Sequence, residues 1–307
     1  MRLRWVLFAW IAAVVGVALL AVPATRTALS SLGSRSKAIA SGTGSSAPDT
    51  QTVKITVQAP PPSPTLRAPA SPSLVRGPGN ASFFSWAFLD RKTGTITGAA
   101  NSATGTNSTE SMVKAFIAGD YLRMQDQAGK TPGNAVLGEL TLMIIDSNDD
   151  MAEKYYELDG SNAVMQRMVK MCGLTHTSLV PYWWAKTQMS PQDAVRYGLC
   201  VANGTAAGQK WTPWLLETMK HVRGGVNDQI SVQKQGGRWG IIDGLPPALA
   251  SQVSIKNGWT QYDVWHINCL AIGPDWILNV MVRIGTLQGG ADACRSVAQQ
   301  LIYTPDI

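Results

Sequence analysis

Apolar and polar positions divide the chain into three parts. An almost unbroken apolar run covers residues 5–22, whereas residues 25–80 show no sustained periodicity and are rich in Ser, Ala, Gly and Pro. Beyond residue 80, apolar positions recur with the periods of helices and strands. The pattern predicts an N-terminal segment over residues 1–24, a linker over 25–80 and one folded domain over 81–307.

The first part of this domain is predicted to be a hairpin followed by helices. Residues 83–89 have the composition of a strand, 90–94 that of a turn, and 95–98 return as a second strand. Helical spacing of apolar residues begins near residue 109. Further helices are predicted over 136–145, 151–158 and 163–172, from Pro191 to just before Gly204, and from Thr212 to Gly224.

The pattern changes to strands in the last part of the domain. Residues 252–256, 262–272 and 276–284 are predicted strands joined by short turns, so they should pair antiparallel. A last helix is expected over 292–302. If the first hairpin joins these strands, the domain has an α+β fold, in which one antiparallel sheet is flanked by helices on both sides.

The net positive charge of the chain lies outside the predicted domain. The 307 residues carry a net charge of +6, but residues 25–80 hold six Lys or Arg against Asp49 alone, which leaves the domain close to neutral. A nucleic-acid-binding domain would need clustered basic side chains on its own surface. We therefore expect no nucleic-acid partner.

The N-terminal segment has the features of an export signal or a membrane anchor. Arg2 and Arg4 precede 18 uncharged, mostly apolar residues, a run that is long for a signal-peptide core and just long enough to span a bilayer. The basic residues should keep this end in the cytoplasm. Val22-Pro23-Ala24 is an acceptable cleavage site, so the segment is either a membrane anchor, which is slightly favoured, or a cleaved signal peptide. A buried core helix is the disfavoured alternative because of the flanking residues.

The linker is predicted to be a disordered, extended stalk. Eight of the 17 prolines lie between Pro48 and Pro78, and such a composition cannot bury enough apolar area to fold. Residues 52–58 alternate like a short strand without an evident partner. Together with the first segment, the stalk would hold an extracytoplasmic domain away from a membrane.

Cysteine usage agrees with an extracytoplasmic location. An even number of cysteines in an exported domain favours disulfides over free thiols. Four cysteines allow three pairings; we favour pairing between sequence neighbours, with four buried thiols as the alternative. The cysteines are Cys172, Cys200, Cys269 and Cys294.

Three short motifs carry the candidate chemistry. Ser111-Met112-Val113-Lys114 lies at the predicted start of a helix, Ser147-Asn148-Asp149 at a helix–loop junction, and Lys256-Asn257-Gly258 on a strand before Trp259. Lys114 lies one helical turn after Ser111, so its amine, if partly desolvated, could take the hydroxyl proton. The amides and dipole at a helix N-terminus would favour a developing oxyanion.

These motifs resemble the S-x-x-K, S-x-N and K-T-G elements of serine β-lactamases and penicillin-binding D-alanyl-D-alanine peptidases. Their order and predicted settings match, and the resemblance covers roughly residues 83–307. The S-x-x-K spacing occurs three times in the chain, but only the copy at 111–114 opens a helix after a hairpin. The resemblance implies a β-lactamase/transpeptidase-like fold.

The resemblance also implies a role for each motif residue. Ser111 would be the nucleophile, Lys114 its base, and Ser147 a proton relay to the leaving group. Lys256 would supply positive charge for a substrate carboxylate. The remaining positions would contact the substrate, with the backbone N–H of Trp259 as a second oxyanion donor; these positions are Asp149, Asn257, Gly258 and Trp259.

Several positions depart from the family pattern. Asp149 replaces an Asn that could donate to a substrate carbonyl, and its carboxylate would favour the charged form of Lys114. Asn257 replaces a hydroxyl residue. Ser111 and Ser147 are closer in sequence than in β-lactamases, so we expect one wall of the cleft to be missing.

A fourth departure concerns the step that would release an acyl group. Residues 183–188 occupy the place of a W-E-x-x-x-N motif whose Glu activates water in class A β-lactamases, but they contain no carboxylate. Hydrolysis of β-lactams by that route is therefore disfavoured. For Trp183-Trp184, packing is a more common role than a substrate platform.

Two functional hypotheses follow. The first is a serine hydrolase of the cell envelope that forms an acyl-enzyme at Ser111 on cell-wall peptide or a similar small acyl substrate. The second is a catalytically impaired binding or scaffold protein with the same fold; in that case the motifs would be ordinary helix-cap, first-turn and strand-end residues. Neither hypothesis requires a cofactor, and no pair of Cys or His has metal-ligand spacing.

Overall fold

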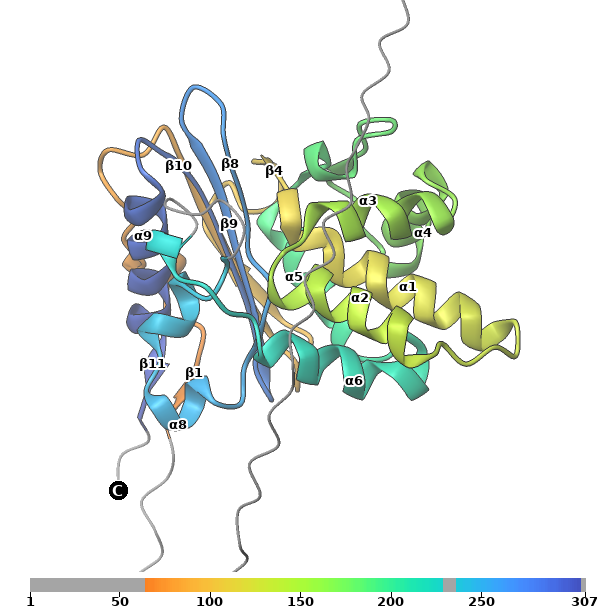
Figure 1. Cartoon of the computed structure of the whole chain (residues 1–307). Helices are drawn as coiled ribbons and strands as arrows, with labels where there is room; N and C mark the ends of the chain where they lie inside the picture. The colour runs from red at the N-terminus through yellow and green to blue at the C-terminus, as the bar shows by residue number, and fades with distance from the viewer. Residues whose placement is uncertain (1–63, 229–235, 305–307) are drawn as a thin grey trace, which may run out of the picture. The chain divides into compact units, whose positions relative to one another are not determined.

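A six-stranded antiparallel sheet lies at the centre of the domain (Figure 1). The computed structural model describes residues 64–228 and 236–304. The strand order is β3-β2-β10-β9-β7, and β8 also pairs with β9. The strands are β2 (Phe83–Asp90), β3 (Ile96–Gly98), β7 (Ser254–Ile255), β8 (Gly258–Gln261), β9 (Trp265–Ile272) and β10 (Trp276–Ile284).

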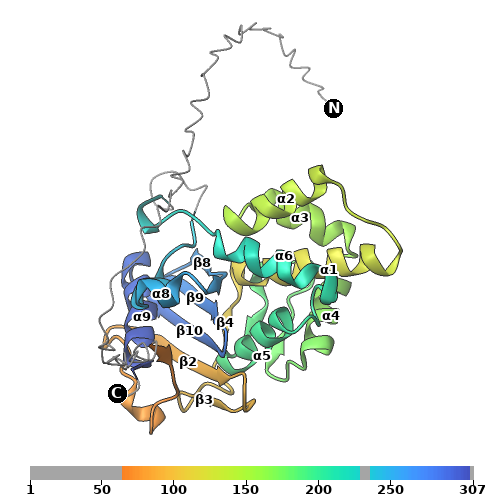
Figure 2. The same ribbon diagram turned by 90° about the horizontal axis from the view of Figure 1, so that it is seen from below.

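Helices cover both faces of this sheet, as predicted (Figures 1 and 2). On one face lie α9 (Leu287–Gln300), the 3-10 turn η4 (Gly240–Gly244) and α8 (Pro247–Ala250). On the other face, α5 (Pro191–Ala202) packs against the sheet, and the remaining helices lie on this side of the sheet. These are α1 (Lys114–Gln127), α2 (Asn134–Ile145), α3 (Asp149–Leu158), α4 (Asn162–Cys172) and α6 (Gly208–Lys220).

Double coverage explains why the central strands are almost entirely buried. In β10, seven consecutive residues from Trp276 to Val282 are buried, and β9 is buried from Ile267 onward. Val280 lies opposite Trp86 of β2 on one side and Cys269 of β9 on the other. The predicted sheet, in which the first hairpin joins the C-terminal strands, is thus confirmed.

Local signals place several helix ends correctly. α5 begins after Ser190, whose side chain accepts a hydrogen bond from the amide of Asp193. α4 ends at Gly173, which adopts the left-handed conformation with φ 64°.

Two helices begin earlier than predicted. α6 begins at Gly208 and contains Pro213 in its interior, whereas the prediction took Pro213 as the first turn. In this helix Thr212 Oγ1 donates to the carbonyl of Gly208 at 2.8 Å. α9 begins at Leu287 after the cap Thr286. Gly290 weakens the helical pattern at this start; a Cβ there would lie 1.8 Å from Ile267 Cδ1, so a larger residue would require the Ile267 side chain to move.

The predicted strand over 252–256 is shorter, and a further strand follows it. β7 ends at Ile255, the chain breaks regular pairing at Lys256-Asn257, and β8 resumes pairing with the same neighbour, β9. Tyr262 lies in the turn between β8 and β9, not in a strand. This break lies next to the candidate site.

The domain begins before the predicted boundary at residue 81. Strand β1 (Thr65–Leu66) pairs with β11 (Ile302–Tyr303), and Leu66 and Val75 are buried. Residues 64–80, which also contain the 3-10 turn η1 (Pro72–Leu74), therefore pack on the domain instead of forming a stalk. The segment 1–24, the rest of the linker and the predicted strand at 52–58 lie outside the described residues.

Three observations complete the fold. A small sheet contains β4 (Asn107–Ser108), β6 (Gln188–Met189) and β5 (Thr177–Ser178), near the 3-10 turn η3 (Trp184–Lys186). Disulfides join Cys172 to Cys200 and Cys269 to Cys294, which confirms the favoured pairing. In the two described ranges, no helix has the length and apolar character needed to span a bilayer.

Candidate active site

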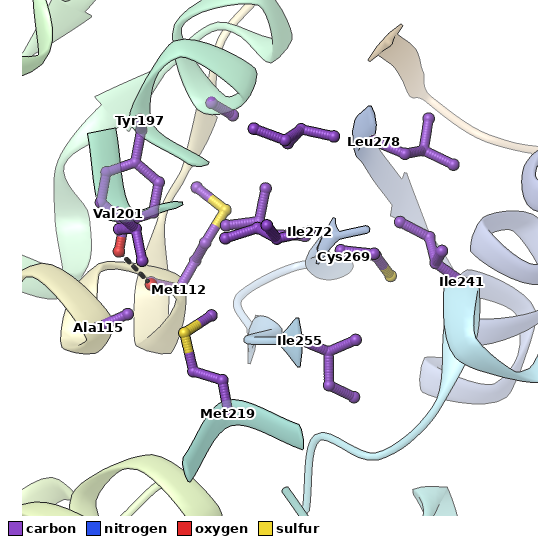
Figure 3. Packing of buried hydrophobic residues seen from close by; sticks show 14 of the residues in the cluster. Met112, Ala115, Tyr197, Val201, Met219, Ile241, Ile255, Cys269, Ile272 and Leu278 are labelled. Atoms are coloured by element: carbon purple, nitrogen blue, oxygen red, sulfur yellow. Dashed lines mark hydrogen bonds between the residues drawn. The ribbon is translucent and has the colours of Figure 1, made fainter. Parts of the chain in front are cut away.

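Ser111 lies on a tightly held turn directly before a helix. The 3-10 turn η2 (Glu110–Val113) continues into α1. Its residue Met112 is fully buried, and Figure 3 shows this side chain among core residues of the sheet and of α5. Tyr197 of α5 donates its hydroxyl to the carbonyl of Met112 at 2.9 Å and accepts from the amide of Phe116 at 3.2 Å. The turn that presents Ser111 is therefore fixed from behind by the core.

Gly258 brings the edge of the sheet against this turn. A Cβ at Gly258 would lie 2.2 Å from the carbonyl oxygen of Thr109, 2.8 Å from the amide nitrogen of Met112 and 3.0 Å from that of Ser111. Only glycine permits such an approach. The approach places Trp259, the next residue of β8, in the lining of the same cavity as Ser111. Its role as an oxyanion donor stays a prediction.

The two motif lysines meet at Ser147. Lys256 Nζ donates to Ser147 Oγ at 2.9 Å, and Lys114 Nζ lies 3.4 Å from the same oxygen and 2.5 Å from the Ser147 carbonyl oxygen. The structure thus places these three residues in one cluster beside the Ser111 turn. Their catalytic roles stay predictions.

The backbone explains why the Ser147 hydroxyl is available to the lysines. The cap of α3 is Asn148, whose Oδ1 accepts from the amide of Met151 at 2.8 Å, so Ser147 is not needed for capping. Ser147 itself has φ 56°, a conformation uncommon for residues other than glycine. Non-glycine residues in this region are found at functional sites more often than elsewhere.

Asp149 forms an ion pair with Lys114. The Asp149 Oδ1 atom lies 2.5 Å from Lys114 Nζ; the Lys114 side chain is fully buried, whereas that of Asp149 is 80% exposed. Burial lowers the pKa of Lys114, and the Asp149 carboxylate acts in the opposite direction. The sequence-based expectation that Asp149 favours the charged lysine is therefore met by a direct contact, while burial has the larger effect.

Lys256 and Asn257 do not reach the cavity. Burial and the neighbouring charge of Lys114 lower the pKa of Lys256 well below its usual value. Asn257 is 1% exposed and donates from Nδ2 to the carbonyls of Gly237 and Trp239, each at 2.8 Å. Neither residue belongs to the lining of the cavity at Ser111, and neither do Lys114 and Ser147. The contact of Lys256 with a substrate carboxylate stays a prediction.

The cavity beside Ser111 has a volume of about 360 Å³. Four of its lining residues carry carboxylates, and three are tryptophans. The lining consists of Glu110, Ser111, Asp149, Asp150, Glu153, Trp183, Trp184, Ala185, Trp259 and Thr260.

The carboxylates other than Asp149 were missed from the sequence. Glu153 follows Asp149 by four residues on α3, a spacing that places both on one helix face and could have signalled the pair. Glu110 is 7% exposed with φ 49°, and its Oε1 accepts from the Tyr262 hydroxyl at 3.2 Å. Burial raises the pKa of Glu110.

The paired tryptophans have different settings. Trp184 is buried and donates from Nε1 to Glu153 Oε2 at 2.9 Å, which fits the favoured packing role. Trp183 is 53% exposed, and Lys186 Nζ lies 3.7 Å from its ring centroid. Among the residues that the structure describes, no group of three His, Cys, Asp or Glu side chains could hold a metal ion.

Comparison with solved structures defines the fold class. The structure of PBP-A matches 74% of this chain and 91% of its own chain, with 15% identity and a TM-score of 0.56. A class A β-lactamase of the last common ancestor of Gram-negative bacteria matches with a TM-score of 0.54 and 14% identity, covering 72% of this chain and 94% of that chain. A β-lactamase from Xanthomonas campestris pv. campestris also matches with a TM-score of 0.54, at 15% identity over 72% of this chain and 91% of its own. The domain therefore has the fold of serine β-lactamases and penicillin-binding proteins, as the motifs suggested.

Sequence comparison gives one group of similar proteins. "Putative lipoprotein LppW" of Mycobacterium tuberculosis (strain ATCC 25618 / H37Rv) is 28% identical over 226 residues, which are 71% of this chain and 68% of the relative. The protein of the same name from Mycobacterium bovis matches with the same identity and coverage. No family model matches the chain.

Proposed function

We propose that this protein is a serine acyl-transfer enzyme of the cell envelope, which acts through an acyl-enzyme at Ser111. The observation that carries the proposal is the cluster beside the Ser111 turn: Lys114 and Lys256 both contact Ser147, and Gly258 packs on the amide of Ser111. By analogy with the fold class, the substrate is a cell-wall peptide or a similar small acyl compound.

The chemistry assigns one role to each polar group. Ser111 Oγ attacks the acyl carbon while its proton passes to Lys114, whose burial lowers the pKa of the amine. Ser147 then carries a proton to the leaving group, and Lys256 orients the Ser147 hydroxyl through the 2.9 Å hydrogen bond. Water releases the acyl group in a second step.

The envelope location is part of the proposal. It is supported by the two disulfides, which persist in oxidising compartments, and by the name of the mycobacterial relative. A lipid on a cysteine does not carry over from that name, because all four cysteines of this chain are in disulfides. The anchoring role of residues 1–24 stays a prediction.

A second candidate function is a binding or scaffold protein without turnover. The ion pair between Asp149 and Lys114 favours it, since a charged lysine cannot accept the Ser111 proton. The inward orientation of Asn257 favours it as well, because that side chain is not available to a substrate.

Intact-mass measurement separates the two candidates. The purified domain is incubated with penicillin G and, separately, with p-nitrophenyl acetate, and the same reactions are run with Ser111→Ala. An adduct that needs Ser111 with either reagent supports the enzyme. The absence of any Ser111-dependent adduct with both reagents supports the binding protein.

A further inference from the structure

Carboxylates outnumber the nearby lysines around the cavity beside Ser111. Of its four carboxylates, Asp149 is paired with Lys114, and Glu110 is near Lys186. Asp150 and Glu153 also line the cavity, and across the described ranges neither forms an ion pair with a Lys or Arg. No Lys or Arg belongs to the lining itself, although Lys186 Nζ lies 3.7 Å from the ring centroid of the lining residue Trp183. A bound anion would therefore be repelled, whereas a cation would be attracted.

The remaining lining is aromatic. Trp183, Trp184 and Trp259 lie around the same space as the carboxylates. Indole rings attract cations to their faces, and tryptophan is the most effective ring for this interaction. Two of these rings already have a lysine ammonium over one face: Lys186 Nζ lies 3.7 Å from the Trp183 ring centroid, and Lys114 Nζ lies 5.3 Å from that of Trp184. The lining therefore already binds ammonium groups through indole rings and carboxylates, which is the chemistry that recognises a substituted ammonium group.

Lys256, the residue predicted to bind an anion, is held in the interior. Lys256 is fully buried, and its amine contacts Ser147 and the Asn257 carbonyl. Asn257 is held by the backbone of residues 237 and 239. The basic and amide groups of this motif thus stabilise the interior, and the charge presented to a ligand is negative.

We propose that this cavity selects acyl donors that carry a substituted ammonium group near the reacting carbonyl. The inference rests on the proposed function of Ser111. In the reaction, a bond forms between Ser111 Oγ and the acyl carbon, the bond from that carbon to the leaving alcohol or amine breaks, and the serine proton leaves with that group. Water then breaks the new ester, releases the carboxylic acid and returns a proton to Ser111.

The test uses three acyl groups of similar length that differ in charge: 4-(trimethylammonio)butanoyl, the isosteric neutral 5,5-dimethylhexanoyl, and the anionic glutaryl monoester. Their N-methylamides measure binding to the wild-type domain at equilibrium by tryptophan fluorescence, without chemistry. Their p-nitrophenyl esters measure acylation of Ser111 by release of p-nitrophenol. We expect the cation to bind and acylate at least about 10-fold better than its neutral isostere at low salt, equivalent to about 1.4 kcal/mol, and the anion to be the poorest.

Variants identify the groups responsible. Asp150→Asn combined with Glu153→Gln should reduce the preference for the cation several-fold, whereas Glu157→Gln, an exposed residue of the same helix outside the cavity lining, should leave it unchanged. Equal binding of the three amides, or a preference for the anion, would overturn the inference while leaving the function of Ser111 open to its own test. Selective binding of the cation with no acylation by any ester would uphold the cation site and reject the proposed enzyme.

Discussion

Asp149 is the residue that most directly controls the state of Lys114. Its carboxylate lies 2.5 Å from the Lys114 amine and stabilises the charged form, although burial lowers the pKa of that amine. Replacement by Asn removes this stabilisation of the charged amine and replaces a carboxylate with an amide that can donate a hydrogen bond. We expect Asp149→Asn to raise the rate of Ser111 acylation by a neutral ester at pH 7 by about 10-fold, the effect of about 1.4 kcal/mol.

Asp150→Asn is the matched control for this prediction. It removes one carboxylate from the same cavity and the same helix, but Asp150 has no contact with Lys114. Stopped-flow release of p-nitrophenol measures both variants. Equal rates for the two variants would show that the ion pair does not limit the reaction.

Lys256 should make the stability of the domain depend on pH. Its pKa is lowered by burial, so the unfolded chain binds more protons than the folded domain between the lowered value and the usual value near 10.5. The free energy of unfolding should therefore rise with pH in this window, by at most about 1.4 kcal/mol per pH unit.

Lys256→Met tests this pH dependence. Urea denaturation from pH 7 to pH 10 should show the wild type gaining stability relative to the variant as pH rises. Lys130→Met, at an exposed position, controls for the loss of one lysine. Parallel stability curves for the wild type and Lys256→Met would show that this amine is protonated to the same extent in the folded and unfolded chains.

At the level of elements, the contact between β8 and the Ser111 turn depends on Gly258. A Cβ there would lie within 3.0 Å of three backbone atoms, which cannot move as flexible side chains can. Gly258→Ala should lower the free energy of unfolding by about 2 kcal/mol or more and abolish acylation of Ser111. Gly138→Ala, in the middle of α2 with nothing within 4 Å, should instead stabilise the domain by up to about 1 kcal/mol.

Chemical denaturation and the acylation assay measure both variants. A Gly258→Ala domain with wild-type stability would contradict the close approach of the strand to the turn.

The sequence predicted those elements whose signals are local. Ser190 and Gly173 mark helix ends by their own conformations, and the central strands are short apolar runs that are buried on both faces. The start of α9 was missed because Gly290 weakens the helical pattern for a tertiary reason, namely its contact with Ile267. Helix boundaries set by packing cannot be found from a residue and its neighbours in sequence.

The same distinction applies to the candidate site. The resemblance of the three motifs to the β-lactamase elements implied that Lys114, Ser147 and Lys256 come together, and they do. It could not reveal that Asn257 is held by distant carbonyls at residues 237 and 239, or that Glu110 and Glu153 line one cavity. These features depend on how separate segments meet in space.

At the level of the whole molecule, residues 64–80 belong to the folded domain. They contribute β1, which pairs with β11, and the buried side chains Leu66 and Val75. Burial of each such side chain contributes about 1.5–3 kcal/mol. A chain that begins at residue 81 should therefore be less stable to urea, by about 3 kcal/mol, than one that begins at residue 64.

Leu66→Ala in the longer chain isolates one of these contacts and should account for part of the difference. Circular dichroism during urea titration measures all three proteins. Identical midpoints for the chains beginning at 64 and 81 would support a stalk that reaches to residue 80.

The central claim is that the fold activates the hydroxyl of Ser111 and of no other serine. Peptide mapping by tandem mass spectrometry, after treatment of the folded domain with a fluorophosphonate, tests it most directly. We predict one modified site, Ser111, whose labelling is lost when the domain is unfolded in urea before treatment. Labelling of Ser147 or a surface serine instead, or labelling of Ser111 that is equal in the folded and unfolded chains, would contradict the account.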